Sequence, residues 1–175
     1  ISDFNLDGKP DLAVANTGSY NVTILMGDGS GGFLERAGSP VGIMNIPLSV
    51  EVADFNLDRK PDIAVANYFY NSLTILMGDG FGGFTNIAVT PIDAGDGLLL
   101  SAVGDFDLDG KPDLAVVNPD SDTVIILLGD GSGRFTEAAG SPVDVGMGPS
   151  RVAVSDFYVV GKPDLAVAYS LFNTM

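Results

Sequence analysis

Short segments of alternating or continuous hydrophobic residues, separated by turn-rich segments, follow one another along most of this 175-residue chain. One part shows the pattern clearly. Residues 49–55 alternate between apolar and polar, residues 62–67 are short and apolar, residues 72–80 are apolar and run into a turn, and residues 84–92 follow. Each apolar run is too short for a helix of average length, and helical spacing is absent. We therefore predict four short strands joined by turns.

The same pattern returns at a constant step of 51 residues. "DFNLDGKPDLAVAN" begins at Asp3, and related segments begin at Asp54, Asp105 and Asp156. The triplet "GDG" keeps the step at residues 27–29, 78–80 and 129–131. Four strands in about 50 residues, repeated, are typical of a propeller blade. We predict an all-β chain, a single partial β-propeller of four-stranded antiparallel blades.

The predicted repeat units are approximately residues 1–48, 49–99, 100–150 and an incomplete 151–175. The chain thus holds about 3.4 repeats, whereas propellers close with four to eight blades. Two explanations are open. The chain is a fragment of a longer propeller, which a start and an end inside motifs favour, or two chains form a homodimer that completes a seven-bladed ring.

Composition narrows the possible chemistry. The net charge of −15 opposes a nucleic-acid partner. No apolar run reaches 18 residues, so we expect no insertion into a membrane. The chain has no Cys and no His, which removes disulfides, thiolate chemistry and Ser-His-Asp triads. Carboxylate chemistry remains.

Carboxylate and amide side chains recur at positions 1, 3, 5 and 9 of the loop that opens each of the first three copies. Ca²⁺ binds six to eight oxygens from carboxylates, amides, backbone carbonyls and water. Alternate side chains on a curled loop converge, and the carbonyl at position 7 can join them. We predict a Ca²⁺ site in each loop, with these ligands: Asp3, Asn5, Asp7, Lys9 (carbonyl) and Asp11; Asp54, Asn56, Asp58, Lys60 (carbonyl) and Asp62; Asp105, Asp107, Asp109, Lys111 (carbonyl) and Asp113.

The intervening residues Phe4 and Leu6 are expected to face the core and fix the loop. The loop is not an EF-hand, because that motif needs a Glu at position 12. Val occupies that position in all three copies, as Val14, Val65 and Val116.

The four loops differ in their expected affinity. The third carries four carboxylates and should bind most tightly. In the second, Arg59 replaces the turn glycine, and a positive φ there costs about 1 kcal/mol. The fourth has Tyr158 and Val160 at the central positions, so we predict no ion beside Asp156.

The segments "GDGSGG" and "GDGFGG" satisfy the pattern G-x-G-x-x-G of dinucleotide sites. That site needs a helix to follow, and here a Phe and a further strand follow instead. We interpret the segments as glycine-rich hairpin turns, in which Asp-Gly supplies positive φ angles.

Together, the acidic loop, the "DLAVAN" strand and the "GDGSGGF" turn resemble the FG-GAP repeat family, including its bacterial VCBS-type members and the integrin α-subunit propeller. The resemblance covers essentially the whole chain. It implies a β-propeller with Ca²⁺ held between the first and second strands of a blade. Arg59, Tyr158 and Val160 depart from the family pattern.

These features lead us to expect a calcium-binding module of a secreted or cell-surface protein, serving adhesion or the binding of a protein or glycan ligand. The alternative is a carbohydrate-binding lectin, with Tyr20, Tyr68, Phe69 and Tyr70 near sugar pockets. An accessory domain of a secreted glycosidase is more remote. We expect no enzymatic activity, because the repeated loops already account for the acids.

Overall fold

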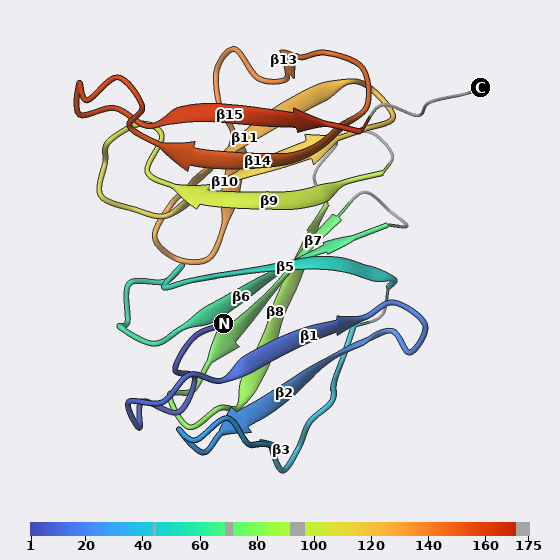
Figure 1. Ribbon diagram of the computed structural model, residues 1–175, viewed down its shortest axis with the longest axis vertical. Coiled ribbons are helices and arrows are strands. Elements are labelled where there is room, and N and C mark those ends of the chain that lie inside the picture. The colour runs from blue at the N-terminus through green and yellow to red at the C-terminus, as the bar shows by residue number, and fades with distance from the viewer. Residues whose placement is uncertain (44, 69–71, 92–96, 171–175) are drawn as a thin grey trace.

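A computed structural model describes residues 1–43, 45–68, 72–91 and 97–170 of the chain (Figure 1). All the regular elements in these residues are β-strands, and the strands that belong to one repeat form one sheet, which we call a blade. The strands of blades 1 and 2 are β1 (Leu12–Asn16), β2 (Asn21–Gly27), β3 (Phe33–Glu35), β4 (Val41–Gly42), β5 (Pro47–Ala53), β6 (Asp62–Asn67), β7 (Ser72–Gly78) and β8 (Phe84–Pro91). Those of blades 3 and 4 are β9 (Leu99–Gly104), β10 (Asp113–Asn118), β11 (Thr123–Gly129), β12 (Phe135–Glu137), β13 (Val143–Asp144), β14 (Pro149–Ser155) and β15 (Asp164–Tyr169).

Blade 2 has the four strands that its sequence predicts, in the order β5-β6-β7-β8, and every pair is antiparallel. The first of them, β5, lies two residues before the predicted range of 49–55, because residues 54 and 55 already belong to the acidic loop. Blade 3 repeats this order and adds β13 beside β11. Blade 1 starts at β1, preceded by one isolated bridge between Ser2 and Asp11, and blade 4 consists of β14 and β15. The all-β fold of antiparallel sheets with a 51-residue repeat is thus confirmed. Closure into a propeller ring stays a prediction.

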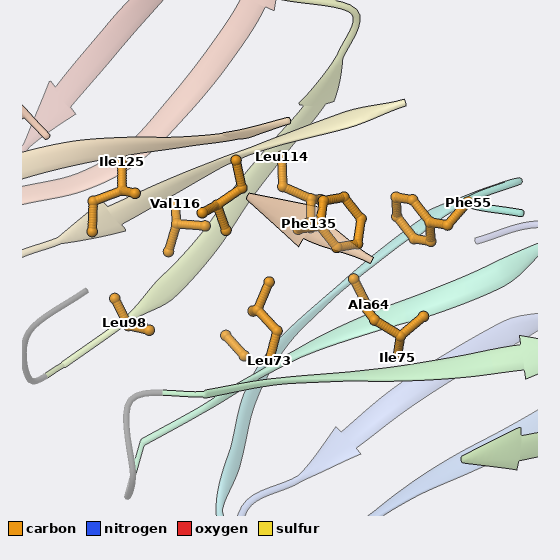
Figure 2. Close-up of a cluster of buried hydrophobic side chains, with 11 residues drawn as sticks. Phe55, Ala64, Leu73, Ile75, Leu98, Leu114, Val116, Ile125 and Phe135 are labelled. Atoms are coloured by element: carbon orange, nitrogen blue, oxygen red, sulfur yellow. The ribbon is translucent and has the colours of Figure 1, made fainter. Parts of the chain in front are cut away.

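The blades stack face to face in one row, with blade 1 and β14–β15 at opposite ends in Figure 1. Successive first strands touch, β5 against β9 and β9 against β14. A core of buried hydrophobic side chains fills each of the three spaces between blades. Figure 2 shows the core between blades 2 and 3, where Leu73 and Ile75 face Leu114 and Val116.

Coverage on both faces explains why the second strand of an inner blade is an almost continuous apolar run. All six residues of β6 and all six of β10 are buried. A strand buried on both sides loses the usual alternation of apolar and polar residues. Full burial of one Leu, Ile or Val side chain contributes about 1.5–3 kcal/mol. These strands therefore hold the stack together. In the described part of the chain, no helix has the length and hydropathy needed to span a membrane.

Candidate functional site

The four acidic loops, which we number by blade, comprise residues 3–11, 54–62, 105–113 and 156–164. Loops 2, 3 and 4 join the first strand of a blade to its second, and loop 1 leads into β1. This is the place that the family resemblance implies.

The first Asp of each loop fixes the backbone of its turn. In loop 1, Asp3 Oδ1 accepts a hydrogen bond from the Asp7 N–H at 3.0 Å, and Oδ2 accepts one from the Gly8 N–H at 2.7 Å. Asn5 Oδ1 also accepts from the Asp7 N–H, at 3.1 Å. Loops 2 and 3 repeat these bonds. Local side-chain acceptors of this kind compete with regular secondary structure and so hold a compact loop.

The Asp at position 9 joins the loop to the body of its blade. The Asp113 side chain is fully buried; its Oδ2 accepts from the Phe106 N–H at 2.7 Å and its Oδ1 from the Gly129 N–H at 2.8 Å. Asp11 and Asp62 are equally buried and make the same pair of bonds. Each of these residues therefore links the start of its loop to the glycine-rich turn that follows β2, β7 or β11.

Burial of these carboxylates changes their acidity. Burial raises the pKa of Asp62 to about 6, although two backbone N–H donors favour the ionised form, and the charges of Asp58 and Asp54 raise it further. Burial also raises the pKa of Asp113, and the charges of Asp107 and Asp105 raise it further. The backbone N–H groups that donate to Asp113 lower its pKa but do not cancel this effect. The acids of one loop thus repel one another, and a bound cation would relieve this repulsion.

Three carboxylates of loop 3 converge. Asp105, Asp107 and Asp109 each place an oxygen within 4.8 Å of the other two. Asp107 and Asp109 are exposed and Asp105 is half-buried, so an ion can reach them from solvent. Hard oxygen donors on an open loop fit Ca²⁺. Asp113 lies outside this group of three, and its oxygens face backbone N–H groups instead.

In loops 1, 2 and 3, the ammonium group of the lysine at position 7 lies beside the carboxylate at position 5. The Lys9 ammonium lies 3.6 Å from Asp7 Oδ2, Lys60 lies 3.1 Å from Asp58 Oδ2, and Lys111 bonds to Asp109. The hydrogen bond from Lys111 lowers the pKa of the Asp109 carboxyl, and Asp109 in turn raises the pKa of Lys111. An incoming cation would compete with this ammonium group for the carboxylate at position 5.

The three expectations for the apolar positions Phe4 and Leu6 and for the turn position Arg59 have different outcomes. Phe4 is 1% exposed, as predicted. The prediction for Leu6 is wrong: its side chain is 55% exposed and its φ is 58°, because the left-handed backbone at position 4 turns it away from the core. Arg59 has a φ of 67°, which confirms the predicted positive φ at a residue other than glycine.

Each of loops 1 and 2 docks onto the glycine-rich turn of the next blade. The Phe4 carbonyl accepts a hydrogen bond from the Gly82 N–H at 2.9 Å, and the Phe4 and Phe84 rings meet edge to face with centroids 5.4 Å apart. Phe55 repeats both contacts with Gly133 and Phe135, at 3.0 Å and 5.5 Å. The "GDG" segments are hairpin turns, as interpreted, and two of them also receive the neighbouring loop.

Loop 4 keeps the scaffold without the central acids. Asp156 accepts from the N–H groups of Val160 and Gly161, at 2.9 and 2.7 Å. Asp164 accepts from the Phe157 N–H at 2.9 Å. Tyr158 and Val160 are largely exposed. The backbone of the loop therefore does not depend on the acids at positions 3 and 5.

The sequence predicts the position-9 Asp only as a cation ligand, and its two hydrogen bonds to the backbone are a further finding. A constant spacing in the sequence indicates the second of these bonds. The Asp and the first Gly of "GDG" are 16 residues apart in all three copies, as Asp11 and Gly27 illustrate. The glycine is needed because a Cβ at Gly27 would collide with the Pro10 carbonyl oxygen.

Comparison with known proteins supports the repeat. The model of the FG-GAP-like repeat matches three overlapping segments, residues 3–65, 54–116 and 105–167. A search of curated proteins and a search of solved structures each gave no match. The three matches cover most of the chain and keep the 51-residue step of the acidic loops. The chain therefore belongs to the family of FG-GAP-like repeat proteins.

Proposed function

We propose that this chain is a calcium-binding β-propeller module of a secreted or cell-surface protein, in which the cation is structural and the module serves adhesion or ligand binding. One observation carries the proposal: three carboxylates of loop 3 converge within 4.8 Å on an accessible loop that buried contacts hold in place. Membership in the FG-GAP-like family supports it.

The same design in loops 1 and 2 supports additional sites. Asn5 and Asn56 replace Asp107 there, so these loops offer fewer negative charges and should bind more weakly. Weak sites suffice where Ca²⁺ is millimolar, which favours an extracellular location. Catalysis by these acids is not expected, because three loops repeat them.

Thermal unfolding tests the cation. The protein is loaded with Ca²⁺ and melted, then melted again in excess EDTA. At a Ca²⁺ concentration 100-fold above Kd, one site adds about 2.7 kcal/mol to the free energy of unfolding. We expect EDTA to lower the Tm clearly. An unchanged Tm would overturn the proposal.

Loop 4 supplies a matched control. The double substitution Asp107→Tyr and Asp109→Val gives loop 3 the central residues of loop 4, whose backbone hydrogen bonds are intact. We expect this variant to keep its Tm in EDTA to within a few degrees and to bind one fewer Ca²⁺ in calorimetric titration. If this variant still bound as many Ca²⁺ ions as the wild type, the ion would not bind in loop 3.

Carbohydrate binding is a second candidate function. Tyr20 and Tyr68 are 53% and 46% exposed. Tyr20 lies in the loop between β1 and β2, and Tyr68 lies in the loop between β6 and β7. Exposed aromatic rings offer flat apolar faces to a sugar. Phe69 and Tyr70 lie outside the described residues. A glycan array tests this function, and the absence of any binder would exclude it.

A further inference from the structure

The lysines of this chain are confined to the acidic loops. The sequence contains four of them, and each occupies position 7 of its loop: Lys9, Lys60, Lys111 and Lys162. Lysine is ordinarily a residue of the whole protein surface, yet this chain has none outside these loops. An ammonium group beside each loop is therefore a specific feature of the repeat.

In loop 3 this lysine engages both oxygens of one carboxylate. Asp109 Oδ1 accepts a hydrogen bond from the backbone N–H of Lys111 at 2.9 Å, and Asp109 Oδ2 accepts one from the Lys111 ammonium group. Asp109 is also one of the three carboxylates that converge. The Lys111 side chain is 34% exposed, so its ammonium group can move into solvent when an ion displaces it.

Loops 2 and 1 repeat the arrangement with a more distant ammonium group. Asp58 accepts from the Lys60 N–H at 3.0 Å and from the Lys60 ammonium at 3.1 Å. Asp7 accepts from the Lys9 N–H at 3.0 Å, but the Lys9 ammonium lies 3.6 Å from Asp7 Oδ2, beyond hydrogen-bond distance. The ammonium group is thus closest in loop 3, the loop with the most carboxylates.

The stem of the lysine lies against the glycine-rich turn of its own blade. A Cβ on Gly131 would lie 3.1 Å from Lys111 Cδ, and one on Gly29 would lie 3.3 Å from Lys9 Cδ. The second glycine of "GDG" therefore leaves room for the stem. This packing directs the ammonium group toward the position-5 carboxylate.

Loop 4 keeps the lysine without its partner. Val160 stands at position 5, so Lys162 has no carboxylate at the place where Asp109 meets Lys111. Both Lys162 and Val160 are exposed. Loop 4 therefore provides a reference in which the same positive charge is present without the acidic centre.

We infer that the lysine at position 7 is a tethered competitor that weakens cation binding in loops 1, 2 and 3. Without an ion, the ammonium group offsets the charge of the position-5 carboxylate. A divalent cation must displace this group and is repelled by it. Because the ammonium is closest in loop 3, it lowers the affinity most there, which narrows the difference between loop 3 and the loops with fewer carboxylates. The inference rests on the proposed cation sites and concerns their affinity.

Calorimetric titration with Ca²⁺ tests this role on a single loop. Asp7→Val and Asp58→Val together give loops 1 and 2 the position-5 residue of loop 4, whose backbone hydrogen bonds are intact. In this background, Lys111→Met keeps the apolar stem and removes the charge. It should tighten Ca²⁺ binding about fivefold, the upper range for an exposed ion pair.

Two matched variants in the same background serve as controls. Lys111→Arg keeps the charge, and Lys162→Met removes one from loop 4. Each should leave the Kd for Ca²⁺ within about twofold of the background value, because neither removes the competing charge from loop 3. In urea unfolding with EDTA, Lys111→Met should be no more stable than the background protein, because it has lost an ion pair.

The possible failures are distinguishable. Unchanged or weaker Ca²⁺ binding by Lys111→Met would overturn the inference and leave the proposed function intact. Equal tightening by either control, or a gain of stability by Lys111→Met in EDTA, would do the same. A background protein that binds no Ca²⁺ would overturn the proposed site in loop 3 and the inference with it.

Discussion

Loops 3 and 4 share a backbone but differ in their centres. In both, the first Asp accepts from the N–H groups at positions 5 and 6, and the last Asp accepts from the N–H at position 2. Loop 3 places carboxylates at positions 3 and 5, whereas loop 4 has Tyr158 and Val160 there. The scaffold of the loop and its capacity for a cation are therefore separate properties.

The two loops also differ in how firmly their blades hold them. Asp113 reaches a second donor, the Gly129 N–H on β11, and is fully buried. Asp164 is only half-buried and bonds within its own loop, to the Phe157 and Tyr158 N–H groups. The position-9 Asp is thus a deep anchor in loop 3 and a shallow one in loop 4.

The largest effect is expected from removal of the deep anchor. Asp113→Ala should lower the free energy of unfolding by about 2–4 kcal/mol, because it leaves two inward-facing N–H groups without acceptors. Asp164→Ala should cost about 1 kcal/mol or less, because water can satisfy the exposed donors of loop 4. Urea unfolding in EDTA measures both without a contribution from the cation. Equal losses would refute the distinction between the two anchors.

A gain of cation binding should follow from restoring the acids of loop 4. The double substitution Tyr158→Asp and Val160→Asp gives loop 4 carboxylates at the four positions that loop 3 uses. Calorimetry should show one additional Ca²⁺ per chain, and saturation at 100-fold above Kd should add about 2.7 kcal/mol of stability at most. The matched control, with Ser at both positions, should bind no additional ion. An unchanged stoichiometry in the Asp variant would show that the scaffold alone is insufficient.

The smallest effect concerns loop 2, where Arg59 has a φ of 67°. Arg59→Gly should stabilise the calcium-free protein by about 0.5 kcal/mol. The strain energy of a positive φ at Arg59 is lost, and this gain slightly exceeds the cost of the extra conformational entropy that glycine gives the unfolded chain. It should also tighten Ca²⁺ binding by removing a positive charge. Arg59→Ala removes the charge but keeps the strain, so only the glycine variant should gain stability in urea unfolding. Equal stability of the two would show that the strain is negligible.

Much of the fold follows from local pattern. The strands of blade 2 could be predicted because short alternating or apolar segments lie between turn residues. The acidic loops could be located because their oxygen-bearing side chains recur with fixed spacing. Arg59 could be assigned a positive φ because glycine occupies the same position in the other copies, as Gly8 illustrates.

Other features arise from contacts that the local pattern does not encode. The exposure of Leu6 depends on its left-handed backbone, which overrides the expectation for an apolar residue. The pairing of Phe4 with Phe84 joins residues 80 positions apart, on neighbouring blades. The burial of Asp11 depends on where the turn at Gly27 comes to lie.

The sequence by itself determined the all-β architecture, the 51-residue repeat and the places where acidic side chains gather, because these depend on periodicity and spacing along the chain. Only the tertiary structure decided which faces are covered. Val14 and Val65 occupy the same position of the same motif, yet one is 40% exposed and the other is 0% exposed. The physical reason is that burial depends on the neighbouring blade: Val65 packs against blade 1, and within the described chain no blade precedes Val14.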